Sequence, residues 1–354
     1  MQEIRIEKTK NPKPKCDVAK VGFGTVFTDH MFVMDYKDGK WQDPRIVPFG
    51  PFSISPAATV LHYAPEIFEG LKAYRTPEGH IQMFRPIENI RRMNNSAERM
   101  CLPQMDEEMF MAALKTLVTV EKDWVPHEPY TSLYIRPVMF GTDAKLGVHA
   151  PREVTFCIIL SPVGPYFKEG MSPVKMLIEK DDVRAVRGGT GFAKCGGNYA
   201  ASLRAGERAE EAGYSQVLWL DAVEKKYIEE GGGMNVMFKI GGKVITPMLN
   251  GSILPGVTRK SLIDIMKRDG IPCEERLISL DEIAKAVKDG KLEECWCCGT
   301  AAVVGPIGEL LYDGKTYRIN DFKTGPMAQR LYDELTDIQW GKKPDPFGWT
   351  VPVC

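Results

Sequence analysis

Along the first 85 residues, hydrophobic and polar positions alternate in short runs, which is the pattern of β-strands. Two of these runs, 31–36 and 71–74, end at the turn signals Asp38-Gly39 and Pro77-Glu78-Gly79, and another short run follows each turn. Asp-Gly between two apolar runs is a strong hairpin signal, because both residues tolerate a positive φ. We therefore expect two antiparallel hairpins in this part of the chain.

After these hairpins the spacing of apolar residues lengthens to three or four positions, which is the period of an α-helix. We expect one helix over about 87–100 and a second that begins at Asp106, a residue type that favours helix N-caps. Strands are predicted again at 131–139 and 154–162. Together these elements predict an α+β unit of modest size.

The length of 354 residues exceeds what one hydrophobic core normally supports, so we expect two domains. Prolines and glycines concentrate at 164–173, which predicts an interdomain connection between a small N-terminal domain, 1–163, and a larger mixed α/β domain, 174–354. In the larger domain we expect strands at 174–179, 217–220 and 294–298, a hairpin over 235–246, helices over 198–212 and 326–340, and a capping box at Ser279 and Glu282.

Composition narrows the class of protein. A net charge of −1 argues against nucleic acid or an anionic membrane as the main partner, and no apolar run reaches the ~18 residues of a membrane span. The N-terminal 20 residues lack the apolar core of a secretory signal, and the nine cysteines follow no disulfide spacing, so we expect a cytoplasmic protein with reduced thiols. Cys295, Cys297 and Cys298 fit a buried strand better than a zinc site, and we expect no metal.

The densest run of glycines, from Gly188 to Tyr199, surrounds one lysine, Lys194. Glycine lets a backbone turn tightly or approach a ligand closely. A lysine amine held in such a turn can form a Schiff base with a carbonyl if its pKa is lowered from about 10.4 toward neutrality. A solvated lysine in a loop is the alternative interpretation, so the rest of the chain has to support the chemical one.

Three other turns carry groups that complement Lys194. They are 229–233, where carboxylates end a strand, 255–258, which opens a helix, and 299–301, which follows a strand. Helix starts and turns of this kind bind anions such as phosphate, although each alone is also an ordinary turn. The spacing around Lys194 is neither that of a P-loop nor that of a dinucleotide-binding turn, so a nucleotide site fails on spacing. A lysine, a carboxylate and phosphate-binding turns are the set that a pyridoxal phosphate site requires.

The order of these motifs over nearly the whole chain resembles that of the branched-chain amino-acid aminotransferases, which are fold-type IV pyridoxal-phosphate enzymes. The resemblance is closest to the longer form of eukaryotes and many bacteria. The segments that carry it are Phe23–Met31, Leu61–Tyr63, Phe68–Gly70, Phe84–Pro86, Arg91–Met93, Tyr134–Pro137, Lys194, Gly196–Tyr199, Gln216–Leu220, Leu254–Thr258 and Gly299–Ala301. It implies reversible transamination of L-leucine, L-isoleucine and L-valine with 2-oxoglutarate, pyridoxal 5′-phosphate as the cofactor, and a homodimer in which residues of one small domain reach the neighbouring site.

Carried over position by position, the resemblance also implies which residues hold the cofactor. Lys194 would form the Schiff base and then move a proton between the substrate Cα and the cofactor C4′. Glu230 would bond the pyridine nitrogen, and Tyr199 the phenolic oxygen. The phosphate would be held by Arg92, Val257, Thr258 and Thr300.

The substrate pocket implied by the resemblance has aromatic walls, which stabilise an aliphatic side chain by about 25 cal/mol per Å² of buried area. The walls would be Phe23, Tyr63, Phe68, Tyr134 and Tyr166. The N–H of Ala301 would help to fix the substrate carboxylate. The same space must also take the γ-carboxylate of glutamate, which needs a cation, and Arg136 is the candidate; a structural salt bridge is the alternative role for this arginine.

Two positions depart from the mammalian members. Ala302 and Gly305 stand where those members carry a Cys-x-x-Cys pair, so we expect no thiol switch, and Gly233 replaces a threonine near the substrate. Within the fold, D-amino-acid aminotransferase and aminodeoxychorismate lyase are alternatives, but both lack the long N-terminal region around 23–30. A catalytically silent protein with this fold is a further alternative, and the presence of Lys194 and Glu230 argues against it.

Overall fold

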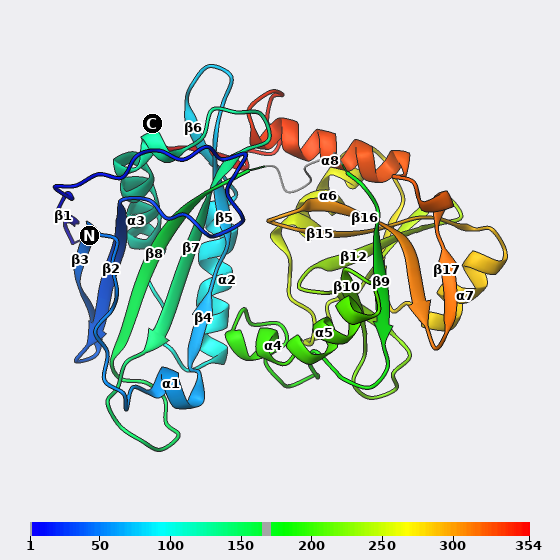
Figure 1. Cartoon of the computed structure of the whole chain (residues 1–354), viewed down its shortest axis with the longest axis horizontal. Coiled ribbons are helices and arrows are strands. Elements are labelled where there is room, and N and C mark those ends of the chain that lie inside the picture. Colours follow the sequence, from blue (N-terminus) through cyan, green and yellow to red (C-terminus); the bar gives the residue numbers. More distant parts are fainter. Residues whose placement is uncertain (1, 165–170) are drawn as a thin grey trace. The chain divides into compact units, whose positions relative to one another are not determined.

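The computed structural model describes residues 2–164 and 171–354, which group into two compact units (Figure 1). Of the described residues, unit 1 contains those up to 164 together with 193–196 and 337–354, and unit 2 contains 171–192 and 197–336. The domain boundaries expected from the sequence stay a prediction. The short segment around Lys194 and the C-terminal residues belong to unit 1, although they are far from the rest of it in the sequence.

Unit 1 is built on a nine-stranded sheet with the order β1-β3-β2-β8-β7-β5-β6-β18, and β4 also pairs with β7. All of these pairs are antiparallel except β1–β3. The strands are β1 (Arg5–Ile6), β2 (His30–Lys37), β3 (Lys40–Pro48), β4 (Glu66–Phe68), β5 (Leu71–Arg75), β6 (Ile81–Phe84), β7 (Ser132–Gly141), β8 (Val154–Val163) and β18 (Thr350–Pro352). The predicted α+β character of this part of the chain is confirmed.

Both predicted hairpins are confirmed. Asp38 and Gly39 connect β2 to β3 with φ values of 54° and 76°, the left-handed conformation that their residue types tolerate. Gly79, with φ of 90°, lies in the turn between β5 and β6.

Two helices, α2 (Pro86–Arg99) and α3 (Glu107–Val120), cover one face of this sheet (Figure 1). The start of α3 is as predicted, because the Asp106 side chain accepts the Met109 N–H at 2.8 Å. Residues from both helices and from the sheet share one hydrophobic core, in which Met93, Phe110 and Phe156 are almost fully buried. Two short helices complete unit 1: α1 (Thr59–Tyr63) and η1 (Lys122–Trp124).

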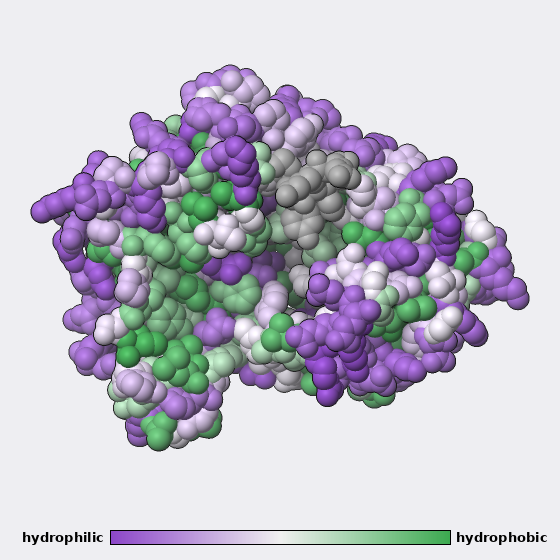
Figure 2. All heavy atoms as spheres, viewed as in Figure 1, coloured by the Kyte–Doolittle hydropathy of each residue, from purple (hydrophilic) through white to green (hydrophobic). Residues whose placement is uncertain are grey.

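The opposite face of the sheet carries a second, smaller apolar cluster. Its buried members are Met31, Val33 and Cys157, and its partly buried members are Val47, Phe49, Val138, Phe140 and Ile159. Figure 2 shows hydrophobic side chains gathered over this part of unit 1. The buried members are at most 5% exposed, so the apolar surface on this face comes from the partly buried members.

Unit 2 is a mixed sheet of nine strands in the order β11-β10-β9-β16-β15-β12-β13-β14, with β17 paired to β16. The strands are β9 (Val174–Glu179), β10 (Gln216–Leu220), β11 (Ile228–Gly231), β12 (Asn235–Ile240), β13 (Lys243–Pro247), β14 (Cys273–Arg276), β15 (Leu292–Gly299), β16 (Val303–Tyr312) and β17 (Lys315–Arg318). Three pairs are parallel, namely β9–β10, β9–β16 and β13–β14. The expected mixed α/β architecture is therefore confirmed.

The single helix predicted over 198–212 is wrong in one respect, because the chain forms two helices there. The Ser202 N–H and the Ser202 hydroxyl both donate to the Tyr199 carbonyl, at 3.0 and 2.7 Å, and this local bonding competes with the helical pattern. The helices after β9 are α4 (Gly196–Ala200), α5 (Leu203–Glu211), α6 (Val257–Arg268), α7 (Leu280–Lys288), η2 (Asn320–Phe322) and α8 (Pro326–Gln339).

The capping box predicted for α7 is half formed. The Ser279 hydroxyl accepts the Glu282 N–H at 3.1 Å, but the Glu282 carboxylate bonds Arg276 instead of returning to the cap. Within the described chain, no helix is both long and apolar enough to cross a membrane.

Candidate active site

Lys194 is fixed to unit 1 through its backbone. Its N–H donates to the Ser96 hydroxyl of α2 at 2.9 Å, and its carbonyl accepts the Phe68 N–H of β4 at 2.9 Å. The Lys194 amine lies 4.9 Å from the centre of the Phe68 ring. Burial, and secondarily the positive charge of Arg92, lowers the pKa of Lys194 to about 8. The lowered pKa favours the chemical interpretation of Lys194 over that of an ordinary solvated lysine.

Arg92 is held by a partner that the sequence reasoning did not single out, Glu69 of the loop between β4 and β5. The Arg92 Nε and Nη2 groups donate to the two Glu69 carboxylate oxygens at 2.7 and 2.8 Å, and Asn89 donates to the same carboxylate at 2.8 Å. Burial raises the pKa of Glu69, but the Arg92 charge and hydrogen bonds, with a contribution from Lys194, outweigh it and leave that pKa below its usual value. The guanidinium of Arg92 is thus oriented by a buried carboxylate.

A second lysine of unit 1, Lys72 on β5, is also buried and was not singled out from the sequence. Burial lowers the pKa of Lys72 to about 8, as it does for Lys194. Among the described residues of unit 1, Lys72 and Lys194 are therefore both amines whose neutral form is accessible near neutral pH.

Tyr134, Arg136 and Phe68 lie on one face of the sheet of unit 1, as the alternation of side chains along β7 and the pairing of β4 with β7 require. Arg136 Nη2 donates to the Tyr134 hydroxyl at 3.0 Å, and the Arg136 guanidinium lies 4.8 Å from the centre of the Phe68 ring. Phe23 contacts Tyr134 edge to face, with ring centres 4.9 Å apart. These residues form an aromatic wall that contains one cation, which is the chemistry predicted for the substrate pocket.

Two residues next to this wall add to it. Gly70 allows the Tyr134 ring to lie against the backbone, because a Cβ at position 70 would be 2.0 Å from the Tyr134 hydroxyl. Glu66, two positions before Phe68 on β4, accepts the Gly196 N–H, and burial raises the pKa of the Glu66 carboxyl. Glu66 was not predicted as a site residue.

Of the other two predicted wall residues, the structure describes only Tyr63, which lies apart from these contacts. Tyr63 lies on α1 with 42% of its surface exposed, and its hydroxyl accepts the Gly147 N–H at 2.9 Å. Tyr166 lies outside the described residues, so its predicted role stays a prediction.

In unit 2, the strand β11 carries the adjacent carboxylates Glu229 and Glu230, whose side chains point to opposite faces of the sheet. Glu230 is 2% exposed; it forms an ion pair with Arg184 and accepts a hydrogen bond from the Asn235 amide at 3.0 Å. Glu229 is bonded instead to Ser252 and Asn250. The two glutamates are therefore distinct in environment, and it is Glu230 that shares a cavity with Tyr199.

That cavity has a volume of about 670 Å³ and lies wholly within unit 2. Arg184, Tyr199 and Glu230 are among its lining residues, as are Gly232 and Gly233. A Cβ at Gly233 would touch the Tyr199 ring at 3.5 Å, an ordinary contact distance. The glycine that replaces the threonine of mammalian members therefore leaves room beside Tyr199.

The N-terminus of α6 has the features of an anion site. The cap residue Gly256 provides no side-chain hydrogen bond to the backbone N–H groups of the first turn, and these groups, with the helix dipole, favour an anion. Val257 and Thr258 are the first residues of this helix and are buried. A Cβ at Gly256 would be 2.0 Å from the Asn235 amide oxygen, so a glycine is needed for this close approach.

Thr300 and Ala301 follow β15 in a turn that leads to β16. Val303, which closes the turn, has φ of 62°, an unfavourable conformation for a β-branched residue. Strain of this kind is concentrated at functional sites, where the surrounding structure maintains it. The placement agrees with the predicted use of this turn, although it does not by itself assign a ligand.

The cysteines of β15 behave as core residues. Cys295, Cys297 and Cys298 are each at most 2% exposed, and burial raises the pKa of Cys298 to about 12. The predicted buried strand is confirmed. Among the described residues, no group of three or more histidine, cysteine, aspartate or glutamate side chains is arranged to hold a metal ion.

Comparison with known proteins agrees with this fold. Residues 66–310 match the family model described as "Amino-transferase class IV". The chain is 54% identical over 354 residues to "Branched-chain-amino-acid aminotransferase 2" of Bacillus subtilis (strain 168), covering 100% of this chain and 98% of that protein. The crystal structure of the Escherichia coli branched-chain amino acid aminotransferase superposes with a TM-score of 0.77 and 26% identity, over 92% of this chain and 99% of the other.

A further crystal structure, of the branched-chain aminotransferase from the thermophilic archaeon Thermoproteus uzoniensis with norvaline, superposes with a TM-score of 0.75 and 26% identity, over 92% and 100% of the two chains. The fold and site thus define a class IV aminotransferase, the pyridoxal-phosphate enzymes of fold type IV. Within that class, the chain belongs to the branched-chain amino-acid aminotransferase family.

Proposed function

We propose that this chain transfers the amino group of L-leucine, L-isoleucine and L-valine to 2-oxoglutarate, giving branched-chain 2-oxo acids and L-glutamate. The observation that carries the proposal is the composition of the unit 1 wall. It combines Lys194, whose pKa is lowered to about 8, with apolar aromatic surface and one cation, Arg136, beside Phe68. An aliphatic side chain and a γ-carboxylate can each find a complement there.

The residues present fit pyridoxal 5′-phosphate. Unit 1 supplies the Lys194 amine, whose pKa is lowered to about 8, and the oriented guanidinium of Arg92. Unit 2 supplies the buried carboxylate of Glu230 and the uncapped start of α6, where Gly256 keeps the backbone open. In the proposal, Lys194 binds the cofactor aldehyde and Glu230 bonds the pyridine nitrogen. Arg92 and the start of α6 both hold the phosphate. When bound, the cofactor supplies a ring that accepts electrons from the bond to the substrate Cα.

The remaining roles are those that the family resemblance implies, and each is compatible with the chemistry of the group. An amine with a pKa near 8 is partly neutral at physiological pH, so Lys194 can take up and return the Cα proton. Tyr199 would donate to the phenolic oxygen of the ring, and the hydroxyls of Thr258 and Thr300 would donate to the phosphate. The Val257 N–H would also bond the phosphate, and the Ala301 N–H would bond the substrate carboxylate.

For assembly, we propose a homodimer formed through the sheet face of unit 1 that carries the partly buried apolar residues Val47, Phe49 and Phe140 (Figure 2). The exposed Tyr63 of α1 would then line the substrate pocket of the other subunit and not the pocket of its own chain. Cytoplasmic location is proposed on the cysteines, all nine of which are free thiols.

A panel of amino donors tests this proposal, with L and D forms of each amino acid and 2-oxoglutarate as the acceptor. The proposal predicts that L-leucine, L-isoleucine and L-valine are turned over at least about tenfold faster than their D forms, a difference of about 1.4 kcal/mol in activation free energy. Equal rates with D-amino acids, or no formation of glutamate from the three L forms, would contradict it.

A further inference from the structure

The ion pair between Arg184 and Glu230 lies in the interior of unit 2. Arg184 Nε is 2.7 Å from Glu230 Oε2, and the two side chains are 8% and 3% exposed. The other carboxylate oxygen, Oε1, accepts the Asn235 amide at 3.0 Å. Both oxygens of Glu230 therefore have a partner supplied by this chain, and one partner is a cation.

Arg184 is itself held in place by backbone carbonyls. Its Nη2 group donates to the carbonyl of Gly191 at 3.2 Å and to the carbonyl of Ser252. A guanidinium fixed by two carbonyls keeps one orientation, so its charge stays directed at Glu230. Arg184 also lines the 670 Å³ cavity that Glu230 and Tyr199 share.

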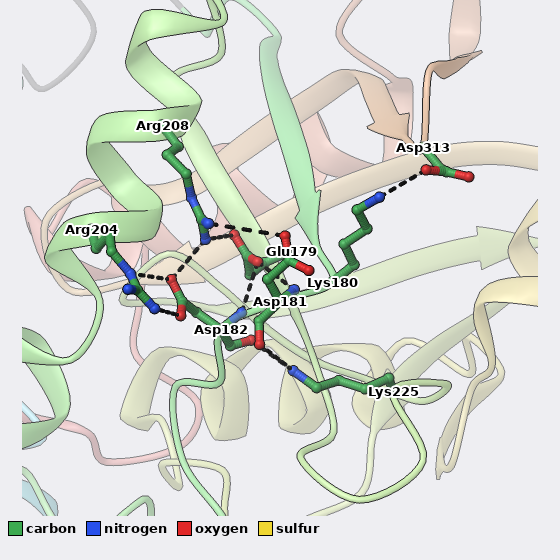
Figure 3. A network of polar contacts seen from close by, with 8 residues as sticks. All are labelled: Glu179, Lys180, Asp181, Asp182, Arg204, Arg208, Lys225 and Asp313. Carbon is green, nitrogen blue, oxygen red and sulfur yellow. Dashed lines mark hydrogen bonds and ion pairs between the residues drawn. The ribbon is translucent and has the colours of Figure 1, made fainter.

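The loop that bears Arg184 is anchored by a network of charges at the end of β9 (Figure 3). The buried Glu179 carboxylate accepts the N–H groups of Asp181 and Asp182 at 2.6 and 2.9 Å. Arg208 of α5 donates to Glu179 at 2.8 Å and to Asp182 at 2.7 Å, and Lys225 donates to the carbonyl of Asp182 at 3.0 Å. The backbone two residues before Arg184 is thus fixed from three directions.

We infer that Arg184 is a positioning residue that keeps the Glu230 carboxylate ionised and directed at the pyridine nitrogen, so that the proton between them resides on the nitrogen. This inference rests on the proposed function, in which Glu230 bonds that nitrogen. It deepens that function by naming Arg184 as the residue that determines whether the proton lies on the pyridine nitrogen or on Glu230.

The physical reason is a competition for one proton. A carboxylate buried without a cation favours its neutral form, and as a neutral acid Glu230 would donate to an unprotonated ring nitrogen. A guanidinium at 2.7 Å favours the ionised carboxylate, which accepts from a protonated nitrogen. Loss of a neighbouring cation changes the balance between ionised and neutral carboxylate by about 10- to 1000-fold.

The test is the ¹⁵N NMR chemical shift of the ring nitrogen in holoenzyme prepared with ¹⁵N-labelled cofactor, followed against pH. Arg184→Met removes the charge and keeps the length of the side chain, and Arg184→Lys keeps the charge. Glu230→Gln removes the carboxylate. Arg187→Met is the matched control, because it removes the same charge from an exposed position three residues along the same loop.

The inference predicts the chemical shift of a protonated ring nitrogen in the wild type and in Arg187→Met, and that of a neutral nitrogen in Glu230→Gln. In Arg184→Met the shift should move toward the neutral value. In Arg184→Lys it should return part of the way to the wild-type value. An unchanged shift in Arg184→Met, with a changed one in Glu230→Gln, would overturn the inference and leave the proposed function intact. An unchanged shift in Glu230→Gln would instead contradict the proposed role of Glu230. Loss of the cofactor by both Arg184 variants would show that the residue maintains the loop, and would overturn the inference as well.

Discussion

Arg92 and Glu69 form a two-bond fork in the interior of unit 1, with donor–acceptor distances of 2.7 and 2.8 Å, and Glu69 exposes none of its surface. Arginine has five N–H donors, so a fork that uses two of them orients the side chain without exhausting its capacity to bind an anion. The geometry presents a guanidinium that is already oriented for the cofactor phosphate assigned to Arg92.

Glu69→Gln should therefore lower both stability and cofactor retention. Removing one partner of a buried ion pair leaves an uncompensated charge, which costs about 3–5 kcal/mol of unfolding free energy. Denaturant unfolding measures that loss. The matched control is Glu107→Gln, because Glu107 pairs with Arg91 at the exposed surface of the same helix pair, and a loss of at most about 1 kcal/mol is expected there. Similar losses of unfolding free energy in Glu69→Gln and Glu107→Gln would contradict the interpretation of Glu69 and Arg92 as a buried ion pair.

The same pair predicts a dependence of stability on pH. The pKa of Glu69 in the folded protein is below its usual value, so the unfolded chain binds more protons as the solution becomes acidic. The stability from Glu69 is present above the ordinary glutamate pKa of about 4.3 and is lost as the pH falls through the lower, folded value. The difference in unfolding free energy between wild type and Glu69→Gln should accordingly shrink with acidification below that pH.

Lys194 also makes stability rise with pH, but in the alkaline range, because its charged form is destabilising in the folded protein. Its pKa falls from 10.5 to about 8 on folding, so the unfolded chain binds more protons between those values and stability gains from this group as the pH rises. In cofactor-free protein, Lys194→Met should be more stable than wild type at neutral pH, with a gap that closes from about pH 8 to about pH 10.5. A gap that is constant over this range would show that the Lys194 amine is not buried.

Arg136→Met tests whether the same wall binds both the aliphatic side chain of leucine and the γ-carboxylate of glutamate. A charge-assisted hydrogen bond contributes about 1.5–3 kcal/mol, so kcat/KM for glutamate should fall about 10- to 100-fold, while that for leucine changes little. Tyr134→Phe is a useful companion, because it removes only the hydroxyl that Arg136 contacts at 3.0 Å. Equal losses with glutamate and leucine would favour the structural role considered from the sequence.

Gly256→Ala tests the start of α6. The added Cβ would lie 2.0 Å from the Asn235 amide oxygen, so we expect a destabilisation of about 1–3 kcal/mol and weaker binding of the cofactor. Gly206→Ala, inside α5 with no atom within 4 Å of the new Cβ, should instead stabilise the protein by up to about 1 kcal/mol. Opposite signs for these two changes, measured by unfolding and cofactor titration, are the expected result.

The sequence predicted local features well because their causes are local. The Asp38-Gly39 hairpin and the Asp106 cap depend on residues a few positions apart, and the alternation on β7 places Tyr134 and Arg136 on one face. Glu69 was not recognised as the partner of Arg92, since 23 positions separate them and only the packing of α2 on the sheet brings them together. The break at Ser202 depends on a hydroxyl that bonds its own backbone, which hydrophobic periodicity does not reveal.

The choice between Glu229 and Glu230 shows a further limit. Alternation guarantees that the two side chains point apart, but the sequence does not say which face of β11 meets the cavity. The choice of Glu230 came from the family resemblance, and the structure adds its physical basis, because Arg184 and Asn235 lie on the Glu230 side while Ser252 and Asn250 lie on the other.

The most direct test of the account is to reduce the holoenzyme with borohydride and to find the lysine that carries the cofactor by peptide mass mapping. Lys194 and Lys72 both have a pKa of about 8 in the folded chain, so chemistry alone would permit either. The account predicts the adduct on the peptide that contains Lys194, and loss of both the adduct and the visible cofactor absorbance in Lys194→Ala. An adduct on Lys72, or one that persists in Lys194→Ala, would contradict it.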